Sequence, residues 1–358
     1  MDCLRILAIN PGSTSTKIAV FEDAKCIFTK NIKHATEELQ GYNKITDQFQ
    51  FRKEIILKEL ETAEIDIDTI KVIVGRGGMV RPIESGIYEV NSLMIEDLHS
   101  NSIRQHASNL GGLIADDLAR DISGARAYIV DPVVVDEMQE VARISGHPEL
   151  ERLSIFHALN QKAIARTHAN SVGKKYEEMN LIVTHLGGGI TVGAHRNGRV
   201  VDVNNGYDGD GPFSPERSGQ LPSGSLVTLC FGGKYSEEEI RKMITGHGGF
   251  VAYLGTNDAY KVEQMIKDGN KKAKIIHEAM AYQVSKEIAA MAAVLHGKVD
   301  AILLTGGIAF DKDFVEYIKQ MTEFIAPIVV YPGEDEMKSL AMSGLMVLRN
   351  EISSKSYK

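Results

Sequence analysis

The sequence predicts an α/β protein built from two related halves, and three observations support this prediction. Strand-like apolar runs alternate with helical patterns along the chain, which is typical of α/β folds. A β-hairpin pattern occurs twice, as LRILAINPGSTSTKIAVF at residues 4–21 and as LIVTHLGGGITVGA at residues 181–194. The length of 358 residues exceeds the size at which a single hydrophobic core keeps growing. We therefore expect two domains, each with one hairpin.

The first hairpin contains a polar loop between two apolar strands. Gly12 relaxes the backbone, residues 13–16 supply hydroxyl groups and amides, and Lys17 adds a positive charge. Hydroxyls, backbone N–H groups and a cation together suit an anion better than a hydrophobic core. The loop is therefore predicted to bind phosphate.

The second hairpin repeats this design with three glycines at positions 187–189 in place of the hydroxyl-rich loop. Asn10 and His185 occupy equivalent places in the two copies, and the second copy turns back through Asn197-Gly198, a strong hairpin signal. Glu22-Asp23-Ala24 forms the corresponding link in the first. Neither loop matches GxxxxGK[ST] or leads directly into a helix, which disfavours P-loop and Rossmann folds. We expect the two hairpins to face one ligand.

Other strand-like runs end at charged or polar residues or at glycines. The predicted strands are KVIV near residue 72, ARAYIV near 127, LIVTH near 183, AILLTGG near 303 and APIVVY near 328. Arg76, Asp131, His185 and the pair Gly306-Gly307 follow four of these runs or lie at their ends. Ligands in α/β sheets gather beyond the carboxyl ends of strands, so these groups are predicted to share one cleft.

The clearest helix is predicted over residues 273–295, where apolar residues recur every three or four positions before Gly297. From the duplication, the first domain is expected to end near Arg166. The second is expected to begin near Asn180, after the polar segment GKKYEEMN. The predicted domains are residues 1–166 and 180–337.

Composition excludes several classes of protein. A net charge of −8, a pI near 5.8 and the lack of a Lys/Arg-rich run argue against nucleic acid or an anionic membrane as partner. Cys3, Cys26 and Cys230 have neither CxxC spacing nor a nearby histidine cluster, which disfavours zinc-ribbon and iron–sulfur sites. No charged leader and no apolar run of about eighteen residues occurs. A soluble, cytoplasmic protein is expected.

Eight motifs, in order along nearly the whole chain, resemble those of the acetate and butyrate kinases, within the sugar kinase, heat-shock chaperone and actin superfamily. The motifs are NPGSTSTK, VGRGG, RQHASNL, IVDP, IFHALN, THLGGG, ERSG and LTGGIAF. The length and the segments NPGSTSTK, VGRGGMVRP and PFSPERSG are more similar to butyrate kinases than to the longer acetate kinases. The resemblance implies two duplicated actin-like, ribonuclease H-like ATPase domains with a central cleft, the first completed by a C-terminal helix at residues 338–350.

The resemblance also implies a reaction, the reversible transfer of the ATP γ-phosphoryl group to a short-chain carboxylate, giving an acyl phosphate and ADP. A carboxylate is already ionised near neutral pH, so no protein nucleophile or general base is needed. The remaining difficulty is the repulsion between two anions, which fixed donors and cations must offset. Homo-oligomers, dimers or larger, are common in the family.

By resemblance, four residues are expected to be catalytic. Arg76 would hold the acyl carboxylate and the phosphoryl group, and Arg217 the phosphoryl group. His157 would donate a hydrogen bond to the transition state, and Asp131 would orient the positive cluster. Substrate or phosphate binding is implied for Asn10, Ser13, Ser15, Lys17, Gly78, His106, His185, Gly187, Gly188 and Gly189, and nucleotide binding for Gly306, Gly307 and Ile308.

Mg²⁺ is expected with the ATP or ADP substrate, held mainly by phosphates and water, with Asn10 as the assigned protein ligand. Where acetate kinases read GIGEN, with a glutamate associated with the metal, this chain reads GIAFD, with Phe310 at that position. A carboxylate ligand could then come from Asp311, Glu334 or Glu336.

Gly78 stands where acetate kinases carry a valine, which predicts room for about two or three more methylene groups in the acyl pocket. We therefore expect butyrate or isobutyrate to be preferred over acetate. Alternatives are an acetate or propionate kinase, a branched-chain acid kinase, or an actin-like or chaperone-like ATPase without acyl phosphate chemistry. An iron–sulfur activator ATPase of the same superfamily would need bridging cysteines, which the sequence lacks.

Overall fold

The computed structural model describes residues 3–42, 44–100 and 106–358. The chain forms two compact units, unit 1 with Met1–Val135 and Asp335–Lys358, and unit 2 with Asp136–Glu334. These limits differ from the sequence-based domains 1–166 and 180–337 mainly after Val135, where the chain already belongs to unit 2.

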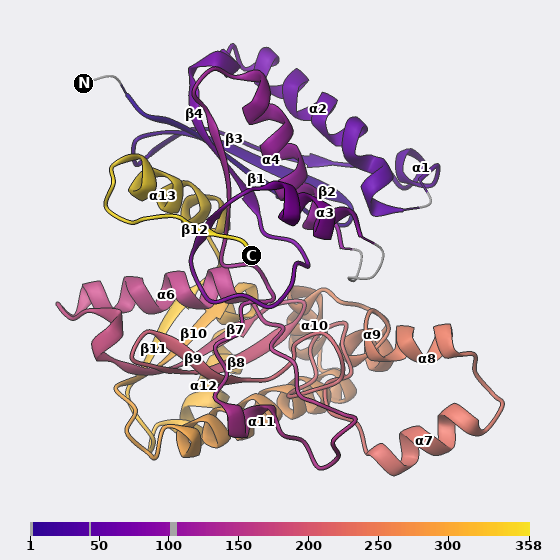
Figure 1. Ribbon diagram of the computed structural model, residues 1–358. Coiled ribbons are helices and arrows are strands. Elements are labelled where there is room, and N and C mark those ends of the chain that lie inside the picture. Colours follow the sequence, from indigo (N-terminus) through magenta and orange to yellow (C-terminus); the bar gives the residue numbers. More distant parts are fainter. Residues whose placement is uncertain (1–2, 43, 101–105) are drawn as a thin grey trace. The chain divides into compact units, whose positions relative to one another are not determined.

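Unit 1 contains a seven-stranded sheet in the order β12-β5-β6-β4-β1-β2-β3. β1 pairs antiparallel with β2 and parallel with β4, and β4 pairs parallel with β6 (Figure 1). The strands are β1 (Arg5–Pro11), β2 (Ser15–Glu22), β3 (Lys25–Lys33), β4 (Ile70–Arg76), β5 (Ile87–Glu89), β6 (Arg126–Val130) and β12 (Lys355–Ser356). The α-helices are α1 (Thr36–Leu39), α2 (Phe49–Thr62), α3 (Ser92–His99), α4 (Asn109–Asp121) and α13 (Glu336–Leu348).

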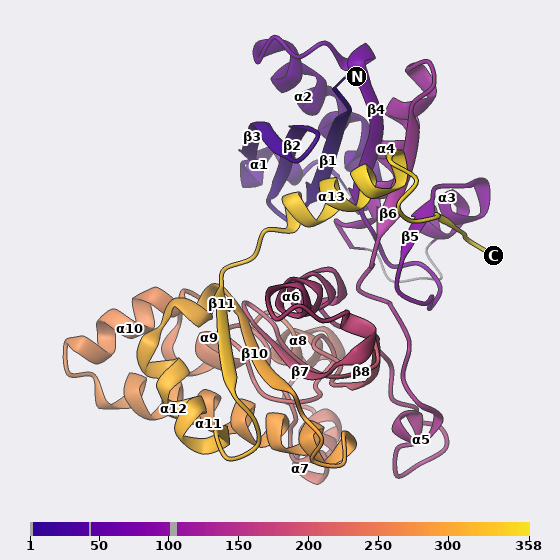
Figure 2. The ribbon, with the colours of Figure 1, turned by 90° about the vertical axis from the view of Figure 1, so that its left-hand side faces the viewer.

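Helices cover both faces of this sheet because its central strands are apolar on both sides. Leu7 and Ile9 of β1 share a buried cluster with Ile56 of α2 and Leu110 of α4. α13 packs on the opposite face, as Figure 2 shows, and Gly344 lets it approach closely. A Cβ atom at Gly344 would lie 2.8 Å from a methyl group of Val74.

Unit 2 contains a five-stranded sheet in the order β11-β10-β7-β8-β9. β7 pairs antiparallel with β8 and parallel with β10. The strands are β7 (Asn180–Leu186), β8 (Ile190–Arg196), β9 (Arg199–Val203), β10 (Ala301–Gly306) and β11 (Ile328–Pro332). The α-helices are α5 (Glu140–Arg143), α6 (Ala158–Ser171), α7 (Ser223–Phe231), α8 (Glu237–Ile244), α9 (Gly249–Leu254), α10 (Ala259–Lys267), α11 (Lys271–Val294) and α12 (Lys312–Thr322).

The unit 2 sheet is also covered on both faces. Ile182 and Leu304 share a buried cluster with residues of α11 and α12. Leu181 and Leu303, which point the other way because strand side chains alternate, share a cluster with Ala165 of α6. The helix predicted over residues 273–295 is confirmed as α11, whose N-terminus is capped by Asn270.

The predicted strands and both predicted hairpins are confirmed. The five runs named from the sequence correspond to β4, β6, β7, β10 and β11, and the hairpins to β1–β2 and β7–β8. Asn10 and His185 are each the penultimate residue of a seven-residue strand. Asn197 and Gly198 both have positive φ angles, 52° and 80°, which is typical of a type I′ hairpin turn. The two units therefore repeat one strand plan.

The helices α7 to α10, between β9 and α11, were not anticipated from the sequence. α7 has no buried residue, and Val227 and Phe231 on it are exposed. Of the helices in the described part of the chain, none is long and apolar enough to cross a membrane.

Candidate functional site

The first hairpin loop lies between β1 and β2 in unit 1. Its turn is closed by a hydrogen bond of 2.7 Å from the Gly12 N–H to the Ser15 carbonyl oxygen. Ser13 is exposed at the tip, and Asn10 lies opposite Lys17 in the ladder. Directly opposed residues of an antiparallel pair project from the same face. The amide of Asn10 and the exposed ammonium group of Lys17 are thus presented together beside the loop.

Arg52 of α2, which sequence analysis missed, holds this loop from behind. Its guanidinium is fully buried and donates hydrogen bonds to the carbonyl oxygens of Gly12 (2.8 Å), Ser13 (3.1 Å) and Ser15 (2.9 Å). Burial lowers the pKa of Arg52 to about 10. A buried cation that binds successive carbonyls fixes the loop conformation and adds positive potential behind it. One sequence signal existed, because Arg52 shares the four-residue spacing of the buried residues Ile56 and Leu60.

Arg76 stands at the end of β4, as expected from the sequence, and it contacts Asn10. Its Nη1 atom lies 3.3 Å from Asn10 Oδ1 and 3.3 Å from Glu336 Oε2. Asn10 Nδ2 donates to the same Glu336 oxygen at 2.5 Å. Glu336, one of the three carboxylates considered for the metal, therefore joins Asn10 and Arg76 in a polar cluster of unit 1.

The segment with His106 packs beside the segment with Arg76. A Cβ atom at Gly75 would lie 2.1 Å from the Gly111 carbonyl oxygen, and one at Gly111 would lie 2.4 Å from the Arg76 carbonyl oxygen. Only glycine permits this approach of α4 to β4. His106 Nδ1 lies 2.8 Å from Ser108 Oγ. Residues 104 and 105 of the RQHASNL motif lie outside the described residues.

The free space predicted beside Gly78 is not present. A Cβ atom at Gly78 would lie 2.6 Å from Asn109 Cα, 2.6 Å from Asn109 Oδ1 and 2.7 Å from Leu98 Cδ2. Asn109 is held there because its Oδ1 accepts a hydrogen bond of 2.8 Å from the Met79 N–H. The protein itself fills the space that a valine would occupy, so the prediction that Gly78 leaves room for a longer acyl chain is wrong.

Gly78→Ala is therefore expected to lower the free energy of unfolding by about 1–3 kcal/mol, as overpacking of a well-packed site does. Thermal unfolding, followed by calorimetry, measures this loss. Gly41→Ala is the matched control in unit 1, because a Cβ atom there would meet nothing within 4 Å. Equal melting temperatures for the two variants would contradict the packing seen at Gly78.

Asp131 follows β6 in a strained conformation, with a positive φ of 36°. Its carboxylate accepts hydrogen bonds from Ser85 Oγ (2.6 Å) and the Gly86 N–H (2.8 Å). Its own N–H donates to the Gly86 carbonyl oxygen at 3.1 Å. Asp131 therefore fixes the segment at residues 85–86, while its expected action on the arginines stays a prediction.

In unit 2, the glycine loop lies next to two stacked histidines. The rings of His157 and His185 are nearly parallel, with centroids 3.8 Å apart and an interplanar angle of 16°. His185 Nδ1 is 2.9 Å from Asn160 Oδ1. The Gly187 N–H donates a hydrogen bond of 3.2 Å to the Gly189 carbonyl oxygen, so this amide is already hydrogen-bonded within the loop.

Arg217 lies directly against this loop. A Cβ atom at Gly189 would be 2.1 Å from Arg217 Nη1 and 2.6 Å from its Cζ, so only glycine leaves room for the guanidinium. Nη1 donates to the Gly206 carbonyl oxygen, and burial lowers the pKa of Arg217. Its Nε–H has no hydrogen-bond partner among the described residues. The structure thus joins Arg217, the glycine loop and two histidines in one unit.

The loop at residues 306–308, which is predicted to bind the nucleotide, also lies next to the second hairpin. Gly306 has a positive φ of 91°, and a Cβ atom there would be 2.3 Å from the Leu186 carbonyl oxygen at the end of β7. Gly306 exchanges two backbone hydrogen bonds with Gly333, of 3.1 and 2.9 Å. After it, Gly307 is exposed and Ile308 is buried. This loop and the glycine loop are thus brought together in unit 2.

The other two carboxylates considered for the metal have different surroundings. Asp311 caps α12 by accepting hydrogen bonds from two backbone N–H groups, and it pairs with His277 Nε2 at 2.8 Å. These bonds lower the pKa of Asp311 against the opposing effect of burial. Glu334 Oε2 lies 3.8 Å from His185 Nε2. Within residues 3–42, 44–100 and 106–358, no three His, Cys, Asp or Glu side chains form a group that could hold a metal by themselves.

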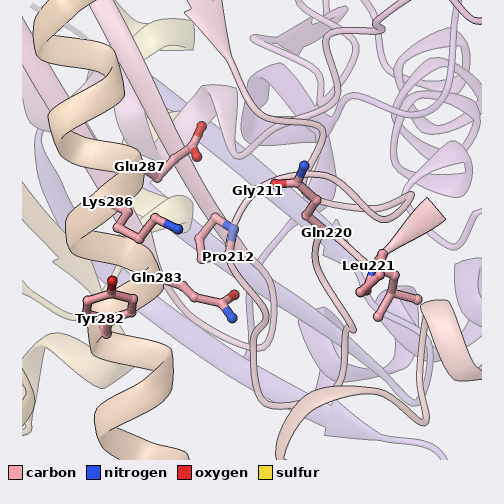
Figure 3. A pocket seen from close by; sticks show the side chains of 9 residues that line it. Gly211, Pro212, Gln220, Leu221, Tyr282, Gln283, Lys286 and Glu287 are labelled. Atoms are coloured by element: carbon pink, nitrogen blue, oxygen red, sulfur yellow. The ribbon is translucent and has the colours of Figure 1, made fainter. Parts of the chain in front are cut away.

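A cavity of about 390 Å³ lies elsewhere in unit 2, between α11 and the loop that carries Pro212. Figure 3 shows Gln283, Lys286 and Glu287 extending from α11 toward that loop. Burial, assisted by the nearby Asp210 carboxylate, raises the pKa of Glu287 to about 7. None of the residues predicted from the sequence lines this cavity.

The raised pKa of Glu287 predicts a pH-dependent stability. Between the unfolded value of 4.5 and about 7, the folded protein binds more protons at this group than the unfolded chain. The stabilising contribution of Glu287 to the free energy of unfolding is fully present below pH 4.5. It is lost as the pH rises through about 7, and the loss amounts to at most about 3 kcal/mol. The melting temperature should therefore decrease between about pH 5 and pH 8, and this decrease should be larger for the wild type than for Glu287→Gln. Parallel falls in the two proteins would contradict the assignment.

Two duplicated sheets, each with a polar hairpin loop between its first two strands, define an actin-like ATPase fold. Similar solved structures include an acetate kinase of Porphyromonas gingivalis, with a TM-score of 0.80 and 19% identity, covering 96% of this chain and 100% of that one. A propionate kinase of Francisella tularensis gives a TM-score of 0.71 and 17% identity, covering 95% and 98%.

Sequence comparison narrows this class to one family. Residues 150–325 match the acetokinase family. The chain is 55% identical over 354 residues to butyrate kinase 2 of Clostridium acetobutylicum, covering 99% of each protein. The chain belongs to the acetokinase family.

Proposed function

We propose that this protein is a butyrate kinase, which transfers the γ-phosphoryl group of ATP reversibly and directly to butyrate or a related short or branched fatty acid. The products are butyryl phosphate and ADP. The observation that carries this proposal is the 55% identity to a butyrate kinase over 99% of both chains. Because the space beside Gly78 is filled, the preference for butyrate over acetate rests on this relative.

In this proposal, unit 2 binds the nucleotide and the transferring phosphoryl group. The loop at residues 187–189 receives the nucleotide phosphates, and residues 306–308 receive the adenosine. Arg217 neutralises charge on the phosphoryl oxygens, and its buried, incompletely hydrogen-bonded guanidinium suits an anion. His157 donates a hydrogen bond to the same oxygens in the transition state.

Unit 1 contributes the acyl side of the reaction. Arg76 binds the acyl carboxylate, which is the nucleophile, and Asn10, Ser13, Ser15 and Lys17 supply further hydrogen-bond donors beside it. The carboxylate oxygen attacks the γ-phosphorus, and the bond from that phosphorus to the β,γ-bridging oxygen breaks. ADP takes the electron pair, so the enzyme needs neither a nucleophile nor a base of its own.

Asn10 and Glu336 supply an amide and a carboxylate oxygen, which are ligand types that Mg²⁺ accepts while it keeps most of its water and phosphate ligands. In this structure both oxygens accept hydrogen bonds from Arg76 Nη1, which the metal would replace. We propose that these two residues hold the metal of the MgATP complex. When bound, Mg²⁺ would neutralise charge on the nucleotide phosphates.

We also propose a cytoplasmic homo-oligomer, supported by the use of ATP and by the resemblance to a family that commonly forms dimers or larger assemblies. Light scattering on the purified protein measures the oligomeric state, and a mass of one chain would contradict that part of the proposal.

Trapping the product tests the proposed reaction. The protein is incubated with MgATP, hydroxylamine and acetate, propionate, butyrate, isobutyrate or valerate, because hydroxylamine converts an acyl phosphate to an acyl hydroxamate. We expect hydroxamate formation, fastest with four-carbon acids. Fastest formation with acetate or propionate would favour those kinases. ATP hydrolysis that is independent of the acid, without hydroxamate, would favour a chaperone-like ATPase.

A further inference from the structure

A chain of hydrogen bonds in unit 2 leads to the ring of His157. His157 Nδ1 lies 3.0 Å from the hydroxyl oxygen of Thr191, the second residue of β8. Gln161, one turn along α6 from His157, donates from Nε2 to the same hydroxyl oxygen at 2.9 Å. Thr191 and Gln161 are both fully buried, so these bonds do not compete with bulk water.

The orientation of the Gln161 amide follows from its neighbours. Its Nε2 atom also lies 3.0 Å from the carbonyl oxygen of Thr191, which can only accept. On the other side, Gln161 Oε1 lies 3.0 Å from His195 Nε2. Burial and the charge of Lys162 lower the pKa of His195 well below its usual value, so this ring is neutral. Tyr176 O–H faces His195 Nδ1 at 2.6 Å, which leaves His195 Nε2–H to donate to Gln161.

The hydrogen bond between the Thr191 hydroxyl and His157 Nδ1 can therefore have only one direction. Its oxygen accepts from Gln161 Nε2 and, at 3.5 Å, from the His157 backbone N–H. A hydroxyl oxygen has two lone pairs and one proton. Both lone pairs are used, so the proton is the group left to face His157 Nδ1, which must then be an acceptor.

We infer that Thr191 and Gln161 are positioning residues that hold His157 in the tautomer protonated on Nε2. The inference rests on the proposed function, because it gives a reason for the tautomer: the Nε2–H is the donor that His157 would offer to the transferring phosphoryl group. The nearly parallel ring of His185, with its centroid 3.8 Å away, limits rotation of the His157 ring and so helps to keep Nδ1 facing Thr191.

Nitrogen-15 NMR of the full-length protein with labelled histidine reports the tautomer directly, and comparison with the His157→Asn variant assigns the signals of His157. In the wild type, we expect Nδ1 of His157 to be unprotonated and Nε2 protonated. Thr191→Val keeps the shape of the side chain but removes the hydroxyl. The tautomer of His157 protonated on Nδ1 should then be populated beside the one protonated on Nε2. Thr191→Ser should restore the wild-type spectrum.

Kinetics provide the second readout. Thr191→Val should lower kcat by about 10–100-fold, by analogy with the loss seen when the hydrogen-bond partner of a metal-binding histidine is removed, while the KM values for ATP and butyrate change little. Thr191→Ser should recover most of the loss, which a purely structural defect at β8 would not explain. Gln161→Met is a second route to the same result, because it frees a lone pair of the Thr191 oxygen.

A wild-type His157 protonated on Nδ1, or a tautomer unchanged in both Thr191→Val and Gln161→Met, would overturn the inference. The NMR result does not depend on turnover. If the wild type forms no acyl phosphate from any acid, the proposed function fails while the tautomer assignment can still hold.

Discussion

Replacing Arg217 with alanine is expected to lower kcat by about 10³-fold and to change the KM for MgATP by only a few-fold. Removing one fixed donor from a developing charge typically costs about 10²–10³-fold, and arginines that stabilise phosphoryl transfer contribute about 10³–10⁵-fold. Arg217 is partly buried against the glycine loop, where its charge is less screened by water than at an exposed site. Steady-state kinetics of butyryl hydroxamate formation measure both constants.

Arg217→Lys serves as the control for charge. Lysine keeps the positive charge but lacks the planar fork of donors, so its kcat should lie between those of the wild type and the alanine variant. The melting temperature of each variant separates lost catalysis from lost folding. Wild-type turnover in a folded Arg217→Ala protein would remove Arg217 from the mechanism.

Gly189→Ala is expected to reproduce most of the effect of Arg217→Ala without touching the arginine. The added methyl group would stand 2.1 Å from Arg217 Nη1 and 2.6 Å from its Cζ. The guanidinium must move, and misplacing a catalytic group by about 1 Å can cost about 10²-fold. We therefore expect kcat to fall by about 10²-fold, as measured by the hydroxamate assay.

The neighbouring glycine supplies a matched control. At Gly188 a methyl group would meet only the Glu216 carboxylate, at 3.6 Å for Oε1, which is ordinary van der Waals contact. Gly188 belongs to the loop proposed to receive the nucleotide phosphates, so an effect of Gly188→Ala on nucleotide binding should appear in the KM for MgATP, while its kcat should stay well above that of Gly189→Ala. Because both substitutions add the same methyl group to one loop, equal losses in the two variants would show that the position of Arg217 is not the cause.

The part of the fold that sequence predicted best is local. The hairpins around Gly12 and Gly188 follow from apolar runs interrupted by turn residues, and the helix α11 from its apolar spacing. Periodicity and turn chemistry are properties of adjacent residues, so they can be read without knowing the fold. The order of the eight motifs then indicated the family.

The long-range contacts that complete the sites could not be predicted from local sequence patterns. Arg52 reaches the carbonyl groups of Gly12, Ser13 and Ser15. Glu336 meets Asn10 although the two residues are separated by most of the length of the chain. The bond from Gln161 to Thr191 joins a helix to a strand. Such pairs depend on the topology of the sheets, which brings distant segments together, and no local pattern encodes them.

Gly78 shows why a resemblance can mislead about packing. The substitution of glycine for valine was interpreted as added space for substrate, but the space is taken by Asn109 and Leu98. Interiors are close-packed, so a missing side chain is normally filled by a neighbour. A specificity prediction therefore needs the surrounding residues as well as the one that differs.

Phosphorus-31 NMR with carboxyl-¹⁸O-labelled butyrate and MgATP tests the proposed transfer most directly. Attack by the carboxylate oxygen on the γ-phosphorus predicts a new acyl phosphate signal, shifted by ¹⁸O in the bridge between carbon and phosphorus, that forms together with ADP. Release of inorganic phosphate alone, without ¹⁸O and at a rate independent of butyrate, would contradict the proposed reaction.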